Sequence, residues 1–437
     1  MAAITDLKVA LAQLAQSGGG ELVLPAGTYP VNDNLVVDER ITLRFMNGAK
    51  LVVASGKSIT INGSVEAGLF HIFDGPGKVE GNMKVSSVYP EWFGAKGDGI
   101  NDDTDGIEKT LQFLDKNQGG VLALSEGTYI LRYLYLRSKV TVQGNGPSSI
   151  LKLKNGTHRN LISLKDNSVM QFRLSNFFID GNRAYNAAGC GIYLNKTAYV
   201  RPDHVMQGNA GDINSTIENI FIYGCAEHGI FLDRTQSSGE FVNIRGIIFN
   251  NVQVISCQKS GIKLNQNTDG KFSDVICTGN AHCGFEIQGC ANNYYVGCKT
   301  FYNGFAAPAS VIGGGFVMKD SGRSSFIGCE AQEEYKHGFY AEGCSLLSFS
   351  ACCADSNGQE NSTYSGYYLK NTQLSTLMGC NSTSFHSPSW QYTGVTFENC
   401  SGITSVLSVN NQLSRTNYIL KGTNTKMSLT INGEAVR

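Results

Sequence analysis

Carboxylate side chains that could act on a glycosidic bond gather in one part of the sequence, between residues 180 and 290. Asp233 lies four residues after Gly229, and Glu227 lies two residues before the same glycine. Glu286 lies two residues after Gly284. Hydrolysis of a glycosidic bond needs two carboxyl groups near one oxygen, one as the acid and the other as the base or nucleophile. We therefore predict that Glu227, Asp233 and Glu286 are the catalytic residues.

Side chains suited to sugar binding surround these carboxylates. Sugar rings pack on aromatic side chains, and sugar hydroxyls exchange hydrogen bonds with charged and amide groups. The predicted substrate-binding residues are Tyr193, His228, Phe231, Arg234, Arg245 and Lys263. Further candidates in the long insertion at residues 195–216 and in the next loop are Asp203, His204, Asp212 and Glu240.

β-Elimination is the competing chemistry. A lyase removes the proton next to the carboxylate of a uronic acid and needs cations that neutralise this carboxylate. The side chains available for these roles are Lys263, Arg234, Arg245, His228 and His204. A second acidic set follows later in the chain, at Asp320, Glu330, Glu333 and Glu334, with Arg323 beside it. Both chemistries stay open from the sequence, and we favour hydrolysis.

A repeated pattern must position these residues. A glycine is followed by two apolar residues with one variable residue between them, at intervals of 23 to 38 residues. The glycines that begin the repeats are Gly191, Gly229, Gly261, Gly284, Gly315, Gly338, Gly366 and Gly394. A constant short strand with connections of variable length is typical of a β-solenoid, in which each turn of the chain adds parallel strands.

Alternation along each strand assigns the side chains to two faces. The first and third residues after each glycine are apolar and are expected to point inward, whereas the second points outward. The outward residues are Tyr193, Phe231, Lys263, Glu286, Val317, Tyr340, Tyr368 and Thr396. Such a face suits an extended polymer, because successive sugar units meet successive strands. Its aromatic residues would equally suit contacts between copies of the chain.

The cysteines follow the same repeat. All 13 lie between Cys190 and Cys400, and many end a short apolar strand in equivalent places. We predict that they are buried, reduced thiols that fill the core of a protein folded in a reducing cytoplasm. Their spacing does not match a zinc finger, and we expect no structural metal and no cofactor.

The composition agrees with a chain that turns often between short strands. Of 437 residues, 51 are glycine and only 8 are proline, with 41% hydrophobic residues and a net charge of −1. These values exclude a disordered chain and collagen. No cluster of Lys and Arg predicts nucleic-acid binding, and no apolar segment is long enough to span a membrane. We predict that many glycines lie at equivalent corners of the repeats.

The N-terminal part contains a duplication at an offset of 100 residues. The matched residues are Leu7, Leu11 and Leu14 with Ile107, Leu111 and Leu114; Gly19 and Gly20 with Gly119 and Gly120; and Gly27-Thr28-Tyr29 with Gly127-Thr128-Tyr129. Each copy predicts a short amphipathic helix that stops at two glycines. A strand then follows and ends in a tight turn at the G-T-Y sequence.

An acidic string precedes the second of these helices. Asp98, Asp102, Asp103 and Asp105 lie within eight residues, but their spacing differs from that of a known calcium loop. We predict instead that Asp102, Asp103 or Thr104 caps the helix, since carboxylates stabilise the positive N-terminus of a helix.

The same segment carries a family resemblance. The sequence FGAKGDG at residues 93–99, followed by DDT at 102–104 and by Ile107, closely resembles the opening of the pectate-lyase-like superfamily of right-handed parallel β-helices. With YPEW in front of it, the segment is similar to bacteriophage tailspike proteins. The resemblance is close over residues 89–130, and the later repeats match in pattern alone.

The resemblance implies an all-β, right-handed parallel β-helix with short N-terminal helices and a C-terminal β cap, assembled as a homotrimer. We expect an N-terminal region at residues 1–90, the β-helix at 91–402, and a cap or trimerisation tip at 403–437. The implied function is that of a depolymerase in a virion tail, which binds and cleaves a capsular or O-antigen polysaccharide at the bacterial surface. We expect a phage tail adaptor protein as a further partner. A polysaccharide lyase and a non-catalytic receptor-binding fibre are the alternatives.

Overall fold

Short parallel strands and two α-helices make up the described part of the chain. The computed structural model describes residues 6–166, 169–195, 215–234, 246–361, 363–384, 391–411 and 416–436. The chain divides into two compact units, residues 1–154 with 172–177, and residues 155–171 with 178–437. Within the described ranges, no helix is both long and apolar enough to cross a membrane.

The first unit begins with helix α1 (Leu7–Gln16) and continues into three small parallel sheets. Their strands are β1 (Gly20–Leu24), β4 (Ile41–Phe45) and β7 (Ser64–Glu66); β2 (Gly27–Val31), β5 (Ala49–Val53) and β8 (Phe73–Asp74); and β3 (Leu35–Val37), β6 (Ser58–Ile61) and β9 (Lys78–Glu80). The remaining elements are the 3-10 helix η1 (Pro90–Phe93), β10 (Asp98–Asp102), α2 (Thr104–Lys116), β11 (Gly120–Ala123), β12 (Gly127–Leu131), β13 (Leu134–Leu136), β14 (Val140–Gln143) and β15 (Ser149–Leu153).

The duplication is confirmed, because α1 and α2 each precede a strand that begins with glycine, β1 and β11. The predicted turn at G-T-Y is wrong, since Gly27 and Gly127 begin strands β2 and β12. Gly127 has a φ of 135°, and a Cβ atom there would lie 2.3 Å from the carbonyl oxygen of Gly97. Glycine therefore allows β12 to approach this backbone closely.

The acidic string before α2 stabilises the chain in two ways. Asp102 accepts a hydrogen bond from the N–H of Thr104, the first residue of the helix, at 3.1 Å. Asp103 does not cap the helix as one of our alternatives predicted. Its two carboxylate oxygens accept the N–H groups of Lys96 at 2.6 Å and Gly97 at 3.2 Å, which fixes the preceding turn.

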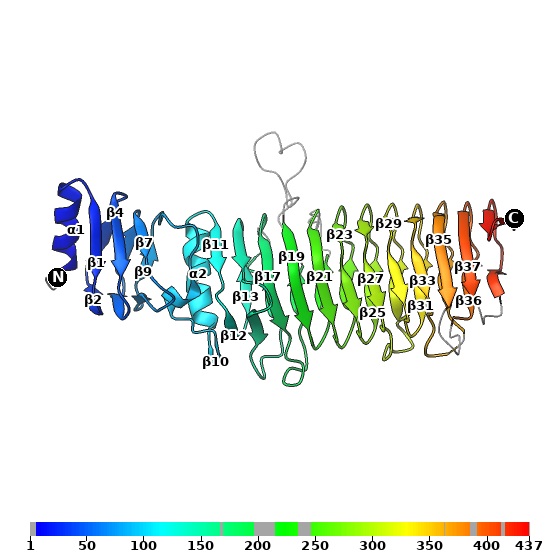
Figure 1. Ribbon diagram of the computed structural model, residues 1–437, viewed down its shortest axis with the longest axis horizontal. Coiled ribbons are helices and arrows are strands. Elements are labelled where there is room, and N and C mark those ends of the chain that lie inside the picture. The colour runs from blue at the N-terminus through cyan, green and yellow to red at the C-terminus, as the bar shows by residue number, and fades with distance from the viewer. Residues whose placement is uncertain are drawn as a thin grey trace. The chain divides into compact units, whose positions relative to one another are not determined.

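The second unit contains two long parallel sheets, and Figure 1 shows their strands side by side in chain order. Sheet I consists of β16 (Ile162–Leu164), β18 (Ile192–Leu194), β20 (Ile230–Asp233), β22 (Ile262–Asn265), β25 (Cys283–Gln288), β28 (Gly314–Lys319), β31 (His337–Glu342), β34 (Ser365–Lys370), β36 (Thr393–Glu398) and β38 (Thr416–Lys421). Each of these strands pairs in parallel with the equivalent strand of the next turn.

Sheet II of the same unit is built in the same way, and many of its turns contribute two short strands. Its strands are β19 (Thr216–Tyr223), β21 (Ile248–Ile255), β23 (Lys271–Ser273), β24 (Ile276–Thr278), β26 (Tyr294–Val296), β27 (Lys299–Phe301), β29 (Ser325–Ile327), β30 (Glu330–Gln332), β32 (Ser348–Ser350), β33 (Cys353–Asp355), β35 (Thr376–Ser384), β37 (Thr404–Asn411), β39 (Ser428–Ile431) and β40 (Glu434–Ala435); β17 (Arg173–Asp180) precedes them and has residues in both units. The last strand, β40, is antiparallel to β39.

The core between the strands contains stacked rings and thiols. One stack runs through Phe249, Phe272, Tyr295, Phe326 and Phe349, with neighbouring ring centroids 4.5 to 4.9 Å apart. All 13 cysteines are free thiols and 12 of them are buried, which confirms the prediction of a core ladder.

The glycines that begin the repeats lie within or beside strands of sheet I. Other glycines lie at equivalent bends as predicted, among them Gly297 and Gly328, with φ of 61° and 59°. A Cβ atom on Gly229 would lie 2.1 Å from Cγ1 of Val254. The absence of a side chain therefore lets the neighbouring core residue fill this space.

Candidate active site

Four predicted site residues form a column on the outer face of sheet I, which we call the exposed column. Tyr193, Phe231, Lys263 and Glu286 occupy equivalent positions on four neighbouring strands. Their side chains are half-buried, whereas the residues before and after each of them point into the core. Since neighbouring strands are ~4.8 Å apart, the column presents one side chain per strand, at a spacing suited to a polymer. The predicted register of these four residues is confirmed.

Two aromatic side chains and a lysine follow one another in the exposed column. The ring centroids of Tyr193 and Phe231 are 5.4 Å apart, and Nζ of Lys263 lies 5.5 Å from the ring centroid of Phe231. The rings offer an apolar surface to the C–H groups of a sugar, and the ammonium group offers hydrogen bonds to hydroxyls or to a carboxylate.

Asp233 lies at the end of β20 and accepts two hydrogen bonds. Oη of Tyr193 donates to Oδ2 at 3.2 Å, and Nδ2 of Asn265 donates to Oδ1 at 2.7 Å. Burial, together with the negative charge of Asp233, raises the pKa of Tyr193 to about 12. The phenol therefore keeps its proton at neutral pH.

Glu286 is held in the ionised form by its neighbours. Nζ of Lys263 donates to Oε1 at 2.8 Å, and Oγ of Ser260 donates to Oε2 at 2.6 Å. Burial alone would raise the pKa of Glu286, but the charge and hydrogen bond of Lys263 and the hydrogen bond of Ser260 outweigh it, and the net pKa is lowered. Glu286 is thus a carboxylate at neutral pH.

Glu227 lies in the turn before β20 and has different partners. Its Oε1 forms an ion pair with Nζ of Lys259 at 2.5 Å, and its Oε2 accepts the N–H of Gly189 at 3.2 Å. Burial raises its pKa, yet the hydrogen bond and charge of Lys259 dominate and lower it overall. Glu227 also lines a pocket of about 240 Å³ together with Arg159 and Ser163.

This pocket lies beside the exposed column, since Ser163 of β16 is the register partner of Tyr193. In the described residues Glu227 forms no hydrogen bond with Asp233 or Glu286. Glu227 thus lies in the turn that enters the second strand of the column, and its side-chain partners differ from those of Asp233 and Glu286.

His228 is a buried part of the framework of the site. Its side chain is 5% exposed, and its Nδ1 accepts the backbone N–H of Ser260 at 3.2 Å. This hydrogen bond assigns the ring proton to Nε2. Burial lowers the pKa of His228 to about 4, so the ring is neutral at pH 7. Because the lone pair of Nδ1 is occupied, His228 can donate a hydrogen bond but is not free to act as a base.

Of the remaining predicted residues, the structure describes Arg234 but not Arg245. The backbone N–H of Arg234 donates to the carbonyl oxygen of Asn265 directly after β20. Arg245 lies outside the described residues, as do Asp203, His204, Asp212 and Glu240.

The outward face beyond Glu286 is covered rather than open, which corrects our expectation of a continuous exposed face. Val317 is 3% and Tyr340 is 4% exposed, and Val311 and Ile312 pack against them. Sγ of Cys283 contacts the carbonyl oxygen of Ile312 at 3.3 Å. The loop before β28 thus closes the exposed column at its Glu286 end. Thr396, farther along, is 1% exposed.

The second acidic set does not form a site. Glu330 belongs to sheet II, where it forms an ion pair with Lys299 at 3.0 Å, and Glu334 is fully buried. Their side chains therefore cannot act on one substrate bond. In the described residues, no three His, Cys, Asp or Glu side chains form a group that could hold a metal ion.

Several site residues were missed from the sequence. Asn265 shares its register position with Asp233, and Ser260 contacts Glu286. Lys259 precedes its repeat glycine by two residues, as Glu227 does. Comparison of equivalent positions between repeats, including those before the glycine, would have found them.

Two family models match the chain. The model described as right handed beta helix region matches residues 241–432, and the model described as rhamnogalacturonase A/epimerase, pectate lyase-like, matches residues 91–307. Together with the parallel strands of both units, these matches decide the fold. The fold is a right-handed parallel β-helix.

Solved structures share this β-helix at low sequence identity. Full-length tailspike protein 2 from an Escherichia coli O157:H7 bacteriophage is 18% identical with a TM-score of 0.65, covering 80% of this chain and 46% of that protein. The A-module of mannuronan C-5 epimerase AlgE4 from Azotobacter vinelandii is 13% identical with a TM-score of 0.59, covering 78% of this chain and 99% of the module.

A curated relative is similar over a shorter stretch. Alginate lyase 7 from Azotobacter vinelandii is 31% identical over 145 residues, which are 30% of this chain and 16% of that protein. The chain therefore spans a small part of this relative and less than half of the full-length tailspike.

Proposed function

We propose that this β-helix is a tailspike-like depolymerase that binds and cleaves a bacterial surface polysaccharide, capsular or O-antigen. The observation that carries the proposal is the exposed column, in which two aromatic rings, a lysine and a carboxylate stand in register with Asp233 beside them. The tailspike, epimerase and alginate lyase that resemble the chain support action on a polysaccharide. The proposed place of action is the virion tail at the bacterial surface.

Hydrolysis by Asp233 and Glu286 is the chemistry we favour. The two residues lie two strands and two positions apart, so their backbones are separated by roughly 12 Å. With the side chains facing each other, this separation leaves room for a water molecule, as in inverting enzymes whose carboxyl groups are about 6.5–9.5 Å apart. Ionised Glu286 would take a proton from this water, and Asp233 would lie on the side of the leaving oxygen, where hydrolysis requires a general acid.

β-Elimination is the second candidate, and the lysines favour it. Both Glu227 and Glu286 pair with a lysine, Lys259 and Lys263. In a lyase, a lysine of the site would turn from its glutamate to the carboxylate of a uronic acid and stabilise the charge that develops when the neighbouring proton is removed. The local similarity to an alginate lyase supports this alternative.

Incubation with purified capsular and O-antigen polysaccharides tests the proposal. We expect new reducing ends, and we expect Asp233→Asn and Glu286→Gln each to lower the initial rate by about 100-fold or more, since a general acid or base contributes 10²–10⁴-fold. Ultraviolet absorbance of an unsaturated uronate would assign β-elimination, and its absence would assign hydrolysis.

Two further variants sharpen the test. Glu330→Gln is the matched control, because Glu330 is a paired surface carboxylate of sheet II and should leave the rate unchanged. Glu227→Gln decides whether this carboxylate takes part, and a rate close to wild type would remove it from the catalytic set. A polymer that binds tightly and yields no products would contradict the enzyme and favour a receptor-binding fibre.

A further inference from the structure

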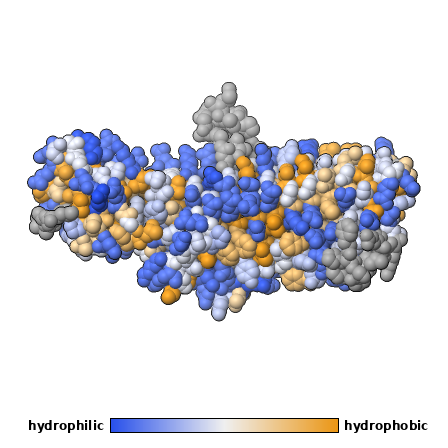
Figure 2. Space-filling model, in the orientation of Figure 1, coloured by the Kyte–Doolittle hydropathy of each residue, from blue (hydrophilic) through white to orange (hydrophobic). Residues whose placement is uncertain are grey.

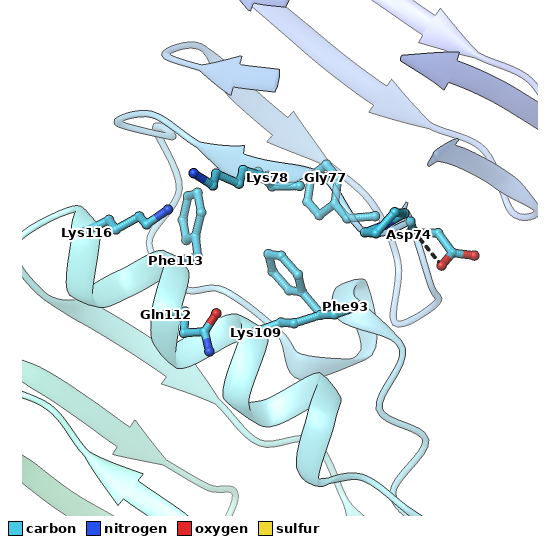
Figure 3. Close-up of a pocket in the computed structure, with 12 residues that line it drawn as sticks. Asp74, Gly77, Lys78, Phe93, Lys109, Gln112, Phe113 and Lys116 are labelled. Atoms are coloured by element: carbon cyan, nitrogen blue, oxygen red, sulfur yellow. Dashed lines mark hydrogen bonds between the residues drawn. The ribbon is translucent and has the colours of Figure 1, made fainter. Parts of the chain in front are cut away.

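A pocket in the first unit has no part in the proposed reaction. It lies between helix α2 and the turn that joins β8 to β9, and its volume is about 270 Å³. In Figure 3, α2 contributes Gln112 and Phe113 on one side, Lys78 lies on the opposite side, and the ring of Phe93 points into the space between them. All its lining residues belong to the first unit, whereas the exposed column belongs to the second.

Three ammonium groups surround this pocket. Lys109 and Lys116 are seven residues apart in α2 and therefore share one side of the helix. Lys78 comes from β9, and Figure 3 shows its side chain extended toward Lys116, next to the ring of Phe113. Nζ of Lys116 forms an ion pair with Oε2 of Glu80 at 3.8 Å. In the described residues, Lys78 and Lys109 form no ion pair.

Asp74, the acidic residue that lines the pocket, does not neutralise the charges of these lysines. Asp74 accepts the N–H of Gly75 at 2.7 Å through Oδ1 and forms an ion pair with Lys50 at 3.2 Å through Oδ2. Its charge is thus already compensated, and the pocket keeps a net positive charge.

The bottom of the pocket is apolar and rigid. The ring centroids of Phe73 and Phe93 are 5.2 Å apart, and those of Phe93 and Phe113 are 6.1 Å apart. The three side chains are 2%, 6% and 4% exposed. The packed rings therefore close the bottom of the pocket and leave a ligand only a small apolar contact surface.

These properties together select a small ligand with an anionic group and hydroxyls, which needs only a limited apolar contact. We propose that the pocket binds a uronic acid residue of a polysaccharide, as a non-catalytic site additional to the exposed column. The carboxylate would lie beside Lys78, with Lys116, already paired with Glu80, next to it (Figure 3). An edge of the sugar ring would contact the small exposed part of Phe93 and Phe113, and a hydroxyl would lie near the amide of Gln112. A neutral sugar would bring no anionic partner to Lys78 and Lys109, and a small inorganic anion would not reach from these lysines to the amide of Gln112.

Titration of the full chain with methyl glucuronoside, methyl glucoside and inorganic phosphate, followed by NMR or calorimetry, tests this inference. We expect methyl glucuronoside to bind with a Kd of about 1 mM, as is typical of a small ligand in a shallow polar site. The neutral glucoside and phosphate should bind at least about tenfold more weakly. A uronic acid oligosaccharide, titrated in parallel, shows whether a residue within a polymer is accepted as well as the single sugar.

Variants locate the site. Lys78→Gln with Lys116→Gln should weaken uronate binding by about tenfold or more, whereas Lys57→Gln, a lysine of the same unit outside the pocket, should not change it. Asp233→Asn should retain binding, so failure of the proposed reaction would leave this inference standing. Equal binding of the neutral glucoside, equal binding of phosphate, or loss of uronate binding in Lys263→Gln but not in the double variant would each overturn it.

Discussion

Glu334 is a carboxyl group inside a ladder of buried amides. Asn280, Asn303, Glu334 and Asn357 follow equivalent strands of sheet II and bond one another in sequence. The backbone N–H of Asn303 donates to Oε2 of Glu334 at 2.7 Å, and Nδ2 of Asn303 donates to Oε1 at 3.2 Å. Complete burial raises the pKa of Glu334 to about 8, although the hydrogen bonds from its neighbours oppose this shift. An acid thus replaces an amide at one step of the ladder.

This raised pKa predicts how stability changes with pH. Below the ordinary pKa of a glutamate, Glu334 is protonated in both the folded and the unfolded chain. Its titration therefore does not lower the free energy of unfolding at such pH values. Between about pH 4.5 and pH 8 the unfolded chain loses the proton while the folded chain keeps it, which lowers the free energy of unfolding by up to about 5 kcal/mol. Glu334→Gln removes this titration, so the variant should lose less stability than wild type between pH 5 and pH 9 in denaturant unfolding.

Glu330→Gln controls for the loss of a charge, because Glu330 is half exposed and pairs with Lys299 at the surface. Its unfolding curve should keep the pH dependence of the wild type. If the pH profiles of Glu334→Gln and wild type ran parallel, Glu334 would have to be ionised in the folded chain, and the assignment of its proton would be wrong.

At the scale of the elements, each turn of the second unit bends at residues with a left-handed backbone. One such bend connects the two strands that each turn adds to sheet II, and its equivalent residues are Asp274, Gly297, Gly328, Ala351 and Gly379, with φ between 51° and 61°. A Cβ atom on Gly328 or Gly379 would meet no atom within 4 Å. The bend therefore selects glycine for its backbone conformation alone, and Ala351 is strained there.

Exchange of alanine and glycine at this bend tests the argument with a matched pair. Ala351→Gly should stabilise the chain and Gly328→Ala should destabilise it, each by about 1 kcal/mol. The left-handed conformation is unfavourable for an L-residue, and this effect exceeds the opposing one, which is that alanine lowers the conformational entropy of the unfolded chain. The midpoints of denaturant unfolding measure both. Shifts of the same sign in the two variants would contradict the conformational explanation.

The same elements explain what could be predicted from the sequence. The exposed column followed from alternation after a repeated glycine, because Phe231 and Lys263 keep the spacing that the pairing of parallel strands requires. The cover over Val317 and Tyr340 did not, because the loop with Val311 and Ile312 has no period that predicts where it packs. Likewise, the pairing of Glu227 with Lys259 depends on side-chain contacts in turns, where alternation gives no direction.

At the scale of the whole molecule, one outer face of sheet II exposes a row of large apolar side chains. Val296, Ile327, Met378 and Val406 share one register column, interrupted by Ser350, and are 41%, 43%, 43% and 42% exposed. We call these four residues the apolar stripe. Figure 2 shows apolar side chains at the surface of the face in view. Contiguous exposed apolar residues on a soluble protein mark a contact surface.

We propose that the apolar stripe lies in the contact between copies of a homotrimer. Burial of these four side chains would remove their apolar surface from water without rearrangement of the strands. Ile327→Glu with Met378→Glu places two carboxylates in this contact, where the cost of desolvating the charges should convert the trimer to monomers. Light scattering coupled to size exclusion would show a mass of three chains for wild type and of one chain for the double variant.

Val36→Glu is the matched control for this experiment. Val36 is an outward residue of β3 in the first unit and is 63% exposed, so its replacement should leave the mass of wild type unchanged. Retention of the trimer by the double variant would move the contact to another face, and a monomeric wild type would refute the trimer itself. If the double variant were monomeric and still cleaved the polysaccharide, the exposed column would have to act within one chain, because no partner copy would be present to complete it.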